Sequence, residues 1–417
     1  MSNNIIDYSE NYISYIFYHI SKRIEELKLR KVGEKMEKVS LVRCEDYEYE
    51  KVKEAVLQSF CNLGGIEKYI QRGDRVLLKV NLLMKKKPEE AATTHPIFVR
   101  ALAEILMEHG AQVIIGDSPG GPFHEKQLRG VYRVCGMEEV AEKTGAQLNY
   151  DTGQVEVKDD TLKLLKNLTV IKVLQDVDKV ISVSKLKTHG MALFTGAVKN
   201  MFGIIPGLLK VEYHFKMSNI VDFSDVLVDI CKYANPILSF MDGIVGMEGD
   251  GPSAGTPRKI GAVIASTSPY HLDVAASSII GLDPREVPTI QRSMERNICK
   301  GNLEDIEFVG GKIEDFRVKK YKVPKIRSVN FFHGRLPRFL ERPMHRLLQP
   351  RPVFLHDQCS GCGDCQESCP PKTITMIHHR PVVNLEHCIR CFCCQELCPQ
   401  KAVKIHRPWL LHRLVQW

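Results

Sequence analysis

The 417-residue sequence has no apolar run long enough to span a membrane, and no N-terminal secretory signal with a small-residue cleavage site. Its fourteen cysteines form no disulfide framework, since nine lie in one C-terminal stretch, eight of them in a regular pattern, and five are scattered. Together these absences predict a cytoplasmic protein in a reducing setting. The hydrophobic content of 44 % is ample for a large core, and the length suggests two or three domains.

Familiar cofactor signatures are also missing. The sequence contains no GxxxxGK[ST] loop, and its glycine-rich segment 249–255 is one residue too long for GxGxxG. Pro252 and Pro257 also prevent that segment from opening a helix as the dinucleotide fingerprint does. The Cys-x3-Cys-x2-Cys order of radical adenosylmethionine enzymes is absent as well. These absences direct attention to the cysteines that are present.

Two copies of one cysteine pattern lie 29 residues apart near the C-terminus. Both read Cys-x2-Cys-x2-Cys-x3-Cys-Pro, which is the spacing of bacterial ferredoxins that bind two 4Fe-4S clusters. In that pattern the fourth cysteine of each run ligates the other cluster. The predicted ligands are therefore Cys359, Cys362, Cys365 and Cys398 for cluster 1, and Cys388, Cys391, Cys394 and Cys369 for cluster 2.

A pair of structural zinc sites is the alternative interpretation of these cysteines, because CxxC pairs also hold zinc. Zinc does not explain a third ligand two residues further on, nor the Cys-Pro endings of both runs. Cys393 breaks the regular spacing of the second run, and we expect it to be a buried thiol rather than a ligand.

A basic segment precedes the cysteine runs. Residues 312–358 contain twelve Lys or Arg residues and four acidic residues. The net charge of this segment is therefore +8, which equals that of the whole chain. We interpret residues 312–352 as a Pro-containing linker between an α/β domain (36–311) and a ferredoxin-like domain (353–408). The linker is either a docking surface for an acidic redox partner, such as a ferredoxin or flavodoxin, or merely a solvated connection, with nucleic acid less favoured.

The two ends of the chain differ in character from the domains. Residues 1–35 are predicted to form a helical extension, and Met36 is a possible alternative start because it precedes the first strand-like segment. Residues 409–417 form an apolar, aromatic tail, which we expect to pack on the protein, with contact to a membrane surface as the alternative.

Residues 36–311 alternate between strand-like and helix-like segments. Short apolar runs separated by helices favour a mostly parallel sheet with helices on both faces, followed by a small C-terminal α+β domain of the bacterial ferredoxin type. The predicted strands are 39–43, 75–80, 112–116, 179–183, 237–241 and 259–265, and the predicted helices are 96–108, 194–201, 221–233 and 271–280.

Polar residues follow four of the predicted strands. Since ligands of open α/β sheets bind at the carboxyl ends of strands, we expect these residues to form one crevice for an anion such as a carboxylate or phosphate. Thr93-Thr-His-Pro96 caps a helix whose free amides also suit an anion. The predicted catalytic residues are His189, Lys185 and Asp242, and the predicted substrate-binding residues are Lys79, Asn81, Thr94, His95, Asp117, Ser118, Lys187, Thr188 and Lys199.

Each of these residues also has a structural interpretation. Glycine-rich strand ends are ordinary turns, and a lysine beside them is often solvated or paired with Asp117 or Asp242. His95, His189 and His214 are a further possible metal site with Asp242 or Glu248, although they lack close ligand spacing.

Several of these motifs resemble a known family, the bacterial and archaeal domain-of-unknown-function family 362. They are Thr93-Thr-His-Pro96, Gly116-Asp-Ser-Pro-Gly120, Lys185-Leu-Lys-Thr-His-Gly190, Thr195-Gly-Ala-Val-Lys-Asn-Met-Phe-Gly203 and the segment from Asp242 to Pro252. Members are often fused to a double-cluster ferredoxin domain, and the second cysteine run, including Cys393, is similar to their form. The resemblance covers about residues 36–408 and implies iron–sulfur binding, but no settled reaction.

The sequence therefore supports three hypotheses. In the first, the protein is an oxidoreductase that relays single electrons through two clusters to or from an anionic substrate, with His189 delivering protons. In the second, it is a non-enzymatic electron carrier or maturation factor whose α/β domain docks a partner protein. In the third, the clusters are structural and the α/β domain performs chemistry without redox change.

Overall fold

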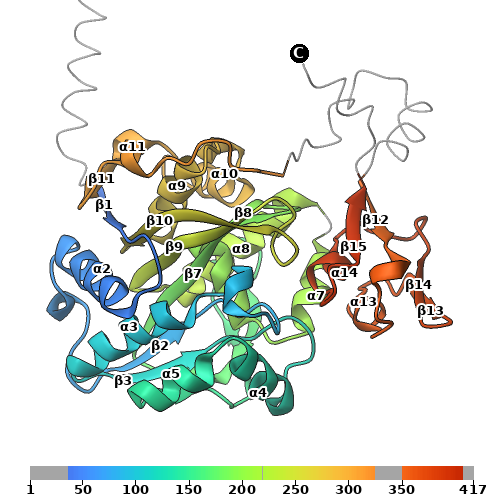
Figure 1. The fold of residues 1–417 in the computed structure, drawn as a ribbon, viewed down its shortest axis with the longest axis horizontal. Helices are drawn as coiled ribbons and strands as arrows, with labels where there is room; N and C mark the ends of the chain where they lie inside the picture. The colour runs from blue at the N-terminus through green and yellow to red at the C-terminus, as the bar shows by residue number, and fades with distance from the viewer. Residues whose placement is uncertain (1–35, 218, 325–349, 407–417) are drawn as a thin grey trace, which may run out of the picture. The chain divides into compact units, whose positions relative to one another are not determined.

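A computed structural model of the chain describes residues 36–217, 219–324 and 350–406 (Figure 1). The predicted N-terminal extension (1–35), most of the predicted linker (325–349) and the predicted apolar tail (409–417) lie outside the described residues. None of the helices in the described ranges has the length and apolar character needed to cross a bilayer.

The α/β part is built on one large sheet, which has nine strands within the described residues. Its order is β11-β1-β10-β9-β7-β2-β3-β4, with β8 paired to β7. The strands are β1 (Glu37–Arg43), β2 (Arg75–Lys79), β3 (Gln112–Gly116), β4 (Gln147–Leu148), β7 (Lys179–His189), β8 (Leu193–Thr195), β9 (Leu238–Glu248), β10 (Thr256–Ser266) and β11 (Ile306–Val309). A separate hairpin is formed by β5 (Gln154–Lys158) and β6 (Asn167–Ile171).

The centre of the sheet is parallel and one side is antiparallel. β2 pairs in parallel with β3 and β7, and β7 pairs in parallel with β9, whereas β10 runs antiparallel to β9 and β1. The carboxyl ends of β2, β3, β7 and β9 therefore meet at one edge, as the sequence predicts. This arrangement confirms the predicted α/β class with a mostly parallel sheet.

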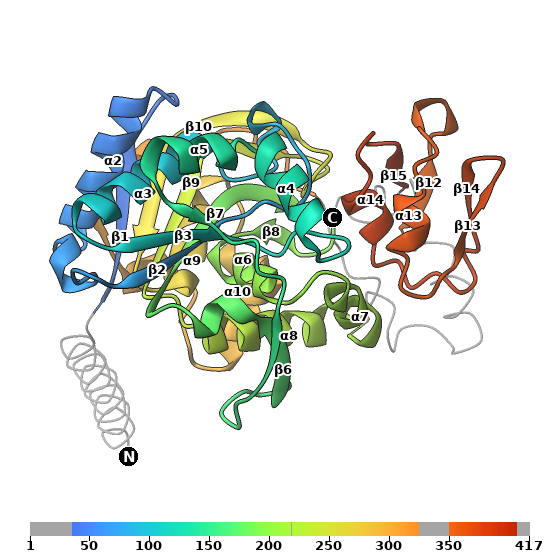
Figure 2. The same ribbon diagram turned by 90° about the horizontal axis from the view of Figure 1, so that it is seen from below.

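Helices cover both faces of the sheet (Figures 1 and 2). The helices are α2 (Tyr49–Asn62), α3 (Pro96–Glu108), α4 (Glu125–Val134), α5 (Met137–Thr144), α6 (Ala197–Asn200), α7 (Leu209–Lys216), α8 (Ile220–Ala234), α9 (Pro269–Ile279), α10 (Pro288–Glu295) and α11 (Ile313–Phe316). Alternation along β2 explains the two layers, because Leu78 packs in the core under α2–α5 and Leu77 packs in the core with α6 and α8. Burying both faces of the central strands accounts for their nearly continuous apolar sequences.

Two elements differ from the predicted ranges. β7 continues to His189 instead of ending at 183, because its last residues pair with β8 and with β9. The predicted helix 194–201 begins only at Ala197, because Leu193–Thr195 form β8. The polar residues from Ser184 to His189 therefore lie within a buried strand rather than in a loop after it, and this change affects the site below.

The C-terminal module consists of two similar halves. β12 (Arg351–Phe354) pairs antiparallel with β15 (Val403–His406), and β13 (Ile374–Ile377) pairs antiparallel with β14 (Arg380–Val383). Two short helices, α13 (Asp364–Glu367) and α14 (Cys393–Glu396), each carry the third cysteine of one run. The repeat of the sequence is thus a repeat of the structure.

The described ends of the basic segment belong to packed elements. Ile313 and Phe316 of α11 are buried, and Tyr321 is 9 % exposed in the same core as α9 and α10. At the other end, β12 already includes residues 351 and 352. The predicted linker boundaries of 312 and 352 therefore fall at or within packed elements.

Candidate functional site

The predicted ligands of cluster 1 converge in the C-terminal module. Cys359, Cys362, Cys365 and Cys398 line one cavity, together with side chains that include Met376 and Val403. Burial and the nearby thiols of Cys362, Cys359 and Cys398 raise the pKa of Cys365 to about 11. Four thiols around one enclosed space fit a cubane, which needs ligands around a volume rather than at one point.

The predicted ligands of cluster 2 are also neighbours. Burial raises the pKa of Cys394 well above its usual value, and the thiols of Cys391, Cys388, Cys365 and Cys369 add to the effect. Three of these four neighbours are the other predicted ligands of cluster 2, including Cys369 from the first run. The crossed ligand pattern therefore fits the arrangement of the chain, and when bound each cluster would supply one-electron chemistry.

The possible histidine metal site is not formed. Within the described residues, no three His, Cys, Asp or Glu side chains converge as ligands of a single metal ion. His214 stacks on Phe223 with ring centroids 4.3 Å apart, whereas His95 stacks on Tyr47 at 3.6 Å. His189 faces Glu396 instead. The three imidazole rings therefore lie in separate places and do not form one site.

The helix that carries Cys394 contacts the α/β part through polar groups. His189 Nε2 at the end of β7 lies 3.0 Å from Glu396 Oε1 of α14, and Gln395 Nε2 donates to Asp250 O at 3.1 Å. His189 Nδ1 accepts from the backbone amides of Met191 and Ala192, both at 3.1 Å, so the proton of a neutral ring sits on Nε2, towards Glu396. His189 therefore positions α14 and has no free nitrogen for a substrate.

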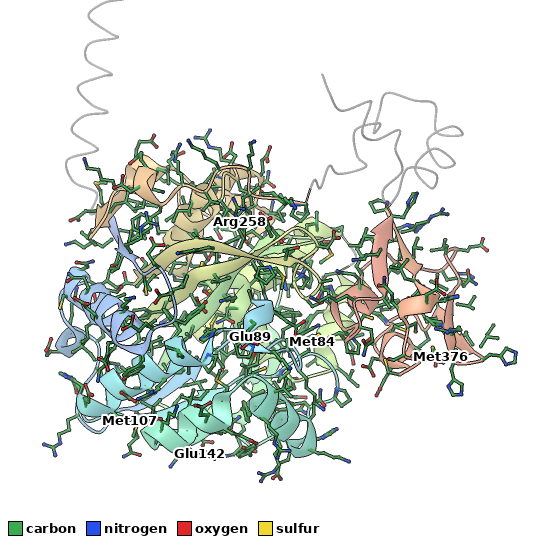
Figure 3. The ribbon with its side chains drawn as sticks, in the orientation of Figure 1. Met84, Glu89, Met107, Glu142, Arg258 and Met376 are labelled. Atoms are coloured by element: carbon green, nitrogen blue, oxygen red, sulfur yellow. The ribbon has the colours of Figure 1, made fainter. Side chains whose placement is uncertain are left out.

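The loop between β2 and α3, which includes Met84 and Glu89 (Figure 3), makes further contacts to this module. The Lys86 ammonium donates to Pro399 O at 3.3 Å and to Glu90 Oε1 at 3.0 Å, and Lys401 lies 3.4 Å from the same Glu90 oxygen. These contacts hold the second cysteine run against the carboxyl edge of the sheet.

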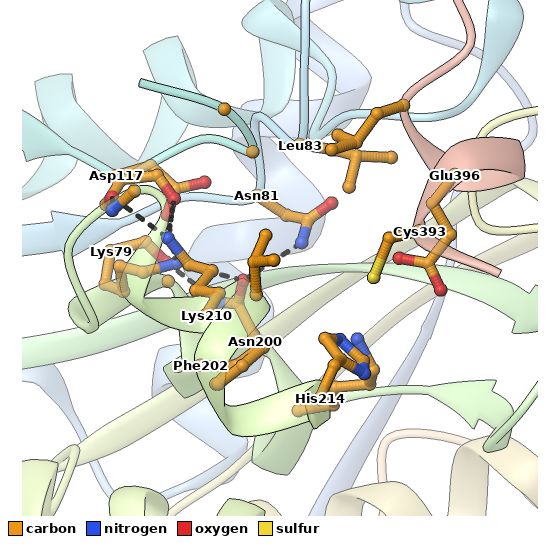
Figure 4. Close-up of a pocket in the computed structure, with 18 residues that line it drawn as sticks. Lys79, Asn81, Leu83, Asp117, Asn200, Phe202, Lys210, His214, Cys393 and Glu396 are labelled. Carbon is orange, nitrogen blue, oxygen red and sulfur yellow. Dashed lines mark hydrogen bonds and ion pairs between the residues drawn. The ribbon is translucent and has the colours of Figure 1, made fainter. Parts of the chain in front are cut away.

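A cavity of about 90 Å³ opens where α14 meets the sheet edge (Figure 4). We call it the ligand cavity. Its polar wall consists of Lys79, Asn81, Asp117, Ser118, Lys199, Asn200, Lys210, His214, Cys393 and Glu396, and its apolar wall includes Leu83, Phe202, Val211 and Leu397. Cys393 and Glu396 flank Cys394 in sequence, so the cavity adjoins the predicted ligands of cluster 2.

A buried ion pair forms the floor of the ligand cavity. Lys79 Nζ lies 2.8 Å from Asp117 Oδ1, and it also donates to Val80 O at 2.7 Å and to Asn200 Oδ1 at 3.3 Å. Asp117 Oδ2 accepts from Leu82 N at 2.7 Å. Gly203 covers the pair so closely that a Cβ there would overlap Asp117 Oδ1 and Lys79 Nζ. The charge of Lys79 is therefore already balanced.

Two other lysines of the ligand cavity lack a carboxylate partner. Lys210 Nζ donates to Ser118 O at 2.8 Å and Ser118 Oγ at 2.9 Å, and burial lowers its pKa to about 7. Lys199 Nζ makes no hydrogen bond or ion pair with any residue in the described part of the chain and lies 5.7 Å from the centroid of the Phe202 ring. Burial also lowers the pKa of Lys199, with Glu396 opposing that effect.

His214 supplies an imidazole to the same wall. Its ring nitrogens make no hydrogen bond within the described residues, and burial lowers its pKa to about 4, so the ring is neutral near pH 7. Lys210 and His214 lie four residues apart on α7 and therefore share one helix face. The wall thus offers ammonium donors and a neutral imidazole to a ligand.

Three of the remaining predicted site residues, Lys185, Asp242 and His95, form a closed cluster away from the ligand cavity. Lys185 Nζ lies 2.8 Å from Asp242 Oδ2, its neighbour in the parallel β7–β9 register. Tyr47 OH accepts from Lys185 at 2.8 Å and donates to Asp242 Oδ1 at 2.7 Å, while His95 N donates to Asp242 Oδ2 at 3.0 Å. Both charged side chains are at most 1 % exposed. This arrangement gives no support to a catalytic role for Lys185 or Asp242.

Other predicted binding residues hold loops in place. Lys187 Nζ donates to Asn81 Oδ1 at 2.7 Å and to Ala92 O at 2.6 Å. Thr94 Oγ1 accepts from Asn81 N and donates to Val183 O, and Thr188 Oγ1 donates to Gly249 O at 2.9 Å. Of the predicted crevice residues, the structure brings Lys79, Asn81, Asp117, Ser118 and Lys199 to the ligand cavity and leaves the others outside it.

Sequence reasoning missed Lys210, His214, Cys393 and Glu396 as lining residues. The i, i+4 spacing of Lys210 and His214 was a usable signal, because it places a cation and an imidazole on one side of a helix. Nothing in the sequence indicated that α14 would close the cavity, since that depends on how the module docks.

The fold and the cysteine module together define an iron–sulfur protein with an α/β domain. The model of the domain of unknown function DUF362 matches residues 76–278, and that of a 4Fe-4S dicluster domain matches residues 351–399. The thylakoid-associated protein sll1697 of Synechocystis sp. is 30 % identical over 319 residues, which cover 74 % of this chain and 97 % of that protein. The chain belongs to the DUF362 family, which confirms the predicted family and the predicted ferredoxin-type domain.

Two solved structures are similar over part of the chain. The lactate racemase apoprotein from Thermoanaerobacterium thermosaccharolyticum is 12 % identical with a TM-score of 0.39, over 59 % of this chain and 58 % of that one. A protein from Thermotoga maritima is 14 % identical with a TM-score of 0.34, over 55 % and 57 %. The chain thus spans less than two thirds of either protein.

Proposed function

We propose that this protein is an oxidoreductase that passes single electrons between an external redox partner and a small anion bound in the ligand cavity. The observation that carries the proposal is the double role of the segment around α14. This segment supplies Cys394, a predicted ligand of cluster 2, and its residues Cys393 and Glu396 form the cavity wall. A ligand in the cavity therefore lies beside the predicted site of cluster 2.

The cavity residues bind and orient the ligand in this proposal. Lys199 and Lys210 attract an anion because neither ammonium has a carboxylate partner within the described residues. His214 replaces His189 as the imidazole that faces the ligand, since both nitrogens of His189 are directed to backbone amides and Glu396. Lys79 and Asp117 keep the floor rigid.

The partner end lies at cluster 1. Among the eight predicted cluster ligands, all of which are described, Cys362 is classed as exposed and Cys394 as buried. An exposed ligand shortens the path to a docked carrier, so a ferredoxin- or flavodoxin-type protein exchanges electrons at Cys362 in this scheme. A cytoplasmic location would give access to such carriers.

The test is anaerobic reoxidation. Protein with reconstituted clusters is reduced, freed of reductant and mixed with a panel of small carboxylates and phosphates while the visible absorbance of the clusters is followed. The reverse direction is tested by adding reduced panel compounds to oxidised protein. We expect at least one compound to exchange electrons with wild type at a rate that Lys199→Met lowers about tenfold or more.

Lys143→Met is the matched control, because Lys143 is an exposed lysine paired with Glu139 on α5, remote from the cavity lining. Exchange with carrier proteins alone, and with none of the small anions, would sink the proposal and favour the electron carrier or maturation factor. Full activity in Cys362→Ser protein that lacks an intact cluster 1 would favour structural clusters instead.

A further inference from the structure

The ligand cavity also indicates the charge and size of its ligand. We propose that it binds a small organic monoanion, a carboxylate of about six or fewer non-hydrogen atoms, with the carboxylate held between Lys199 and Lys210. The proposal rests on the proposed function for the choice of cavity, and it goes further by naming the ligand class.

The charges of the wall favour a single negative charge. Lys79, Lys199 and Lys210 face Asp117 and Glu396, so the lining carries one net positive charge when His214 is neutral and all three lysines are protonated, which for Lys210 requires a pH below about 7. The Lys79–Asp117 pair balances itself at 2.8 Å. One monoanion therefore neutralises the cavity, whereas a dianion would leave an uncompensated charge in a partly buried space.

The positions of the spare donors define where the carboxylate binds. Each Lys ammonium has three N–H donors, and those of Lys199 meet no acceptor within the described residues. Lys210 uses its donors on Ser118 and Pro119 oxygens, which fixes the ammonium without neutralising it. The carboxylate therefore accepts hydrogen bonds from Lys199, and Lys210, whose three donors are already used, attracts it by charge.

The other wall favours an organic body over inorganic phosphate. Leu83, Phe202, Val211 and Leu397 line the ligand cavity and offer apolar surface. A short carbon chain covers this surface, while phosphate would place charged oxygens against it and lose hydration without compensation. His214 and the second N–H of the Asn81 amide, whose other N–H donates to Asn200, remain to bind a carbonyl or hydroxyl group on the chain.

The volume limits the length of the ligand. A water-sized group needs at least about 10–15 Å³ of such volume. At about 90 Å³, and with the larger of these two figures for each group, the ligand cavity accommodates about six such groups. Unsubstituted monocarboxylates of up to four carbons fit this limit, and succinate, with eight non-hydrogen atoms, exceeds it.

The test is calorimetric titration of the anaerobically purified, cluster-loaded protein with acetate, propionate, glyoxylate, succinate and inorganic phosphate. We expect the three monocarboxylates to bind and the other two to bind at least tenfold more weakly. Lys199→Met and Lys210→Met should each weaken glyoxylate binding about tenfold to hundredfold, as for a lost charged hydrogen bond. Lys143→Met should leave the affinity unchanged.

Cluster absorbance and thermal midpoint establish that each variant is folded and loaded. Tighter binding of phosphate or succinate than of propionate would overturn the proposal, and so would wild-type affinity in both lysine variants. Should either variant fail to load, Lys199→Gln and Lys210→Gln replace it, with the same loss expected. Lysine-dependent binding of monocarboxylates without any electron exchange supports this inference and refutes the proposed function, so the two failures are separable.

Discussion

Two groups of lysines lie at the carboxyl edge of the same sheet, and their surroundings differ. Lys185 is buried, whereas Lys199 and Lys210 are only partly buried. The Lys185 ammonium forms an ion pair with Asp242 Oδ2 and donates a hydrogen bond to Tyr47 OH, both at 2.8 Å. Lys199 and Lys210 have no carboxylate within ion-pair distance in the described parts of the chain. Burial lowers the lysine pKa in both groups, but only Lys185 combines complete burial with a carboxylate partner, and this combination distinguishes a structural cation from the partly buried binding cations.

The largest effect on stability should come from removing Lys185, whose ammonium is fully paired. Lys185→Met leaves Asp242 buried with an uncompensated charge, which costs about 3–5 kcal/mol of the free energy of unfolding. Denaturant titration measures this loss. In the folded fraction of this variant, affinity for cavity ligands should be unchanged, because Lys185 does not line the ligand cavity.

Lys259→Met is the comparison variant, since Lys259 and its partner Glu45 are exposed. Its effect should stay within about 0.5 kcal/mol. A stable Lys185→Met protein that has lost electron exchange would reverse our assignment of the two groups and restore the sequence prediction for Lys185.

A smaller effect is expected where β7 reaches the C-terminal module. His189→Ala removes the group that lies 3.0 Å from Glu396 Oε1, so a half-buried carboxylate loses its partner. The expected cost is about 1–3 kcal/mol, and the measurement is again denaturant unfolding. His189→Gln retains a donor and should recover part of the loss. If both variants match wild type, His189 does not hold α14 in place.

Lys199, which has no carboxylate partner in the described residues, should instead affect the reduction potential of the nearby cluster. Lys199→Met removes a positive charge near Cys393, so adding an electron to a cluster beside it becomes less favourable. We expect the midpoint potential of cluster 2 to fall by about 60 mV, which corresponds to a tenfold change in a one-electron equilibrium. Redox titration without ligand measures it, and Lys185→Met should shift it less. Equal shifts in the two variants would remove the distinction between the groups.

Much of the fold followed from periodicity. The predicted ranges 112–116 and 96–108 coincide with β3 and α3. An apolar run defines the strand, and a proline marks the start of the helix. The range of β7 did not follow, since Lys185, Lys187 and His189 interrupt the apolar pattern. These polar side chains are tolerated in the strand only because Asp242, Asn81 and Glu396 bind them from distant parts of the sequence.

The candidate site was predictable to a similar degree. Lys79, Asp117 and Lys199 follow or flank strand ends, and topology alone brings them to one edge. The separation of Lys185 from Lys199 depends on the β7–β9 register and on Tyr47, which enters from the loop after β1. No local sequence pattern indicates such tertiary contacts. The sequence prediction therefore placed Lys185 and Lys199 in one crevice.

The smallest expected effect is a pH dependence that belongs to the unpaired group alone. Burial lowers the pKa of Lys210 to about 7, with Asp117 opposing this change and Lys79 and Lys199 adding to it. Below this pKa the ammonium is charged and binds an anion, and above it the neutral amine does not. Glyoxylate affinity should therefore be highest below pH 7 and fall about tenfold by one pH unit above the pKa, as the charged fraction falls.

Calorimetric titrations across this range measure the fall, and Lys210→Arg isolates its source, because a guanidinium stays charged throughout. The Arg variant should show a flat profile where wild type declines. A decline of the same size in the Arg variant would assign the titration to another group, such as Lys199, and not to Lys210. Burial also lowers the pKa of Lys187 to about 7, and Lys187 donates to Asn81 of the cavity wall. A flat profile in the Lys210→Arg variant is therefore the result that excludes Lys187 as the source.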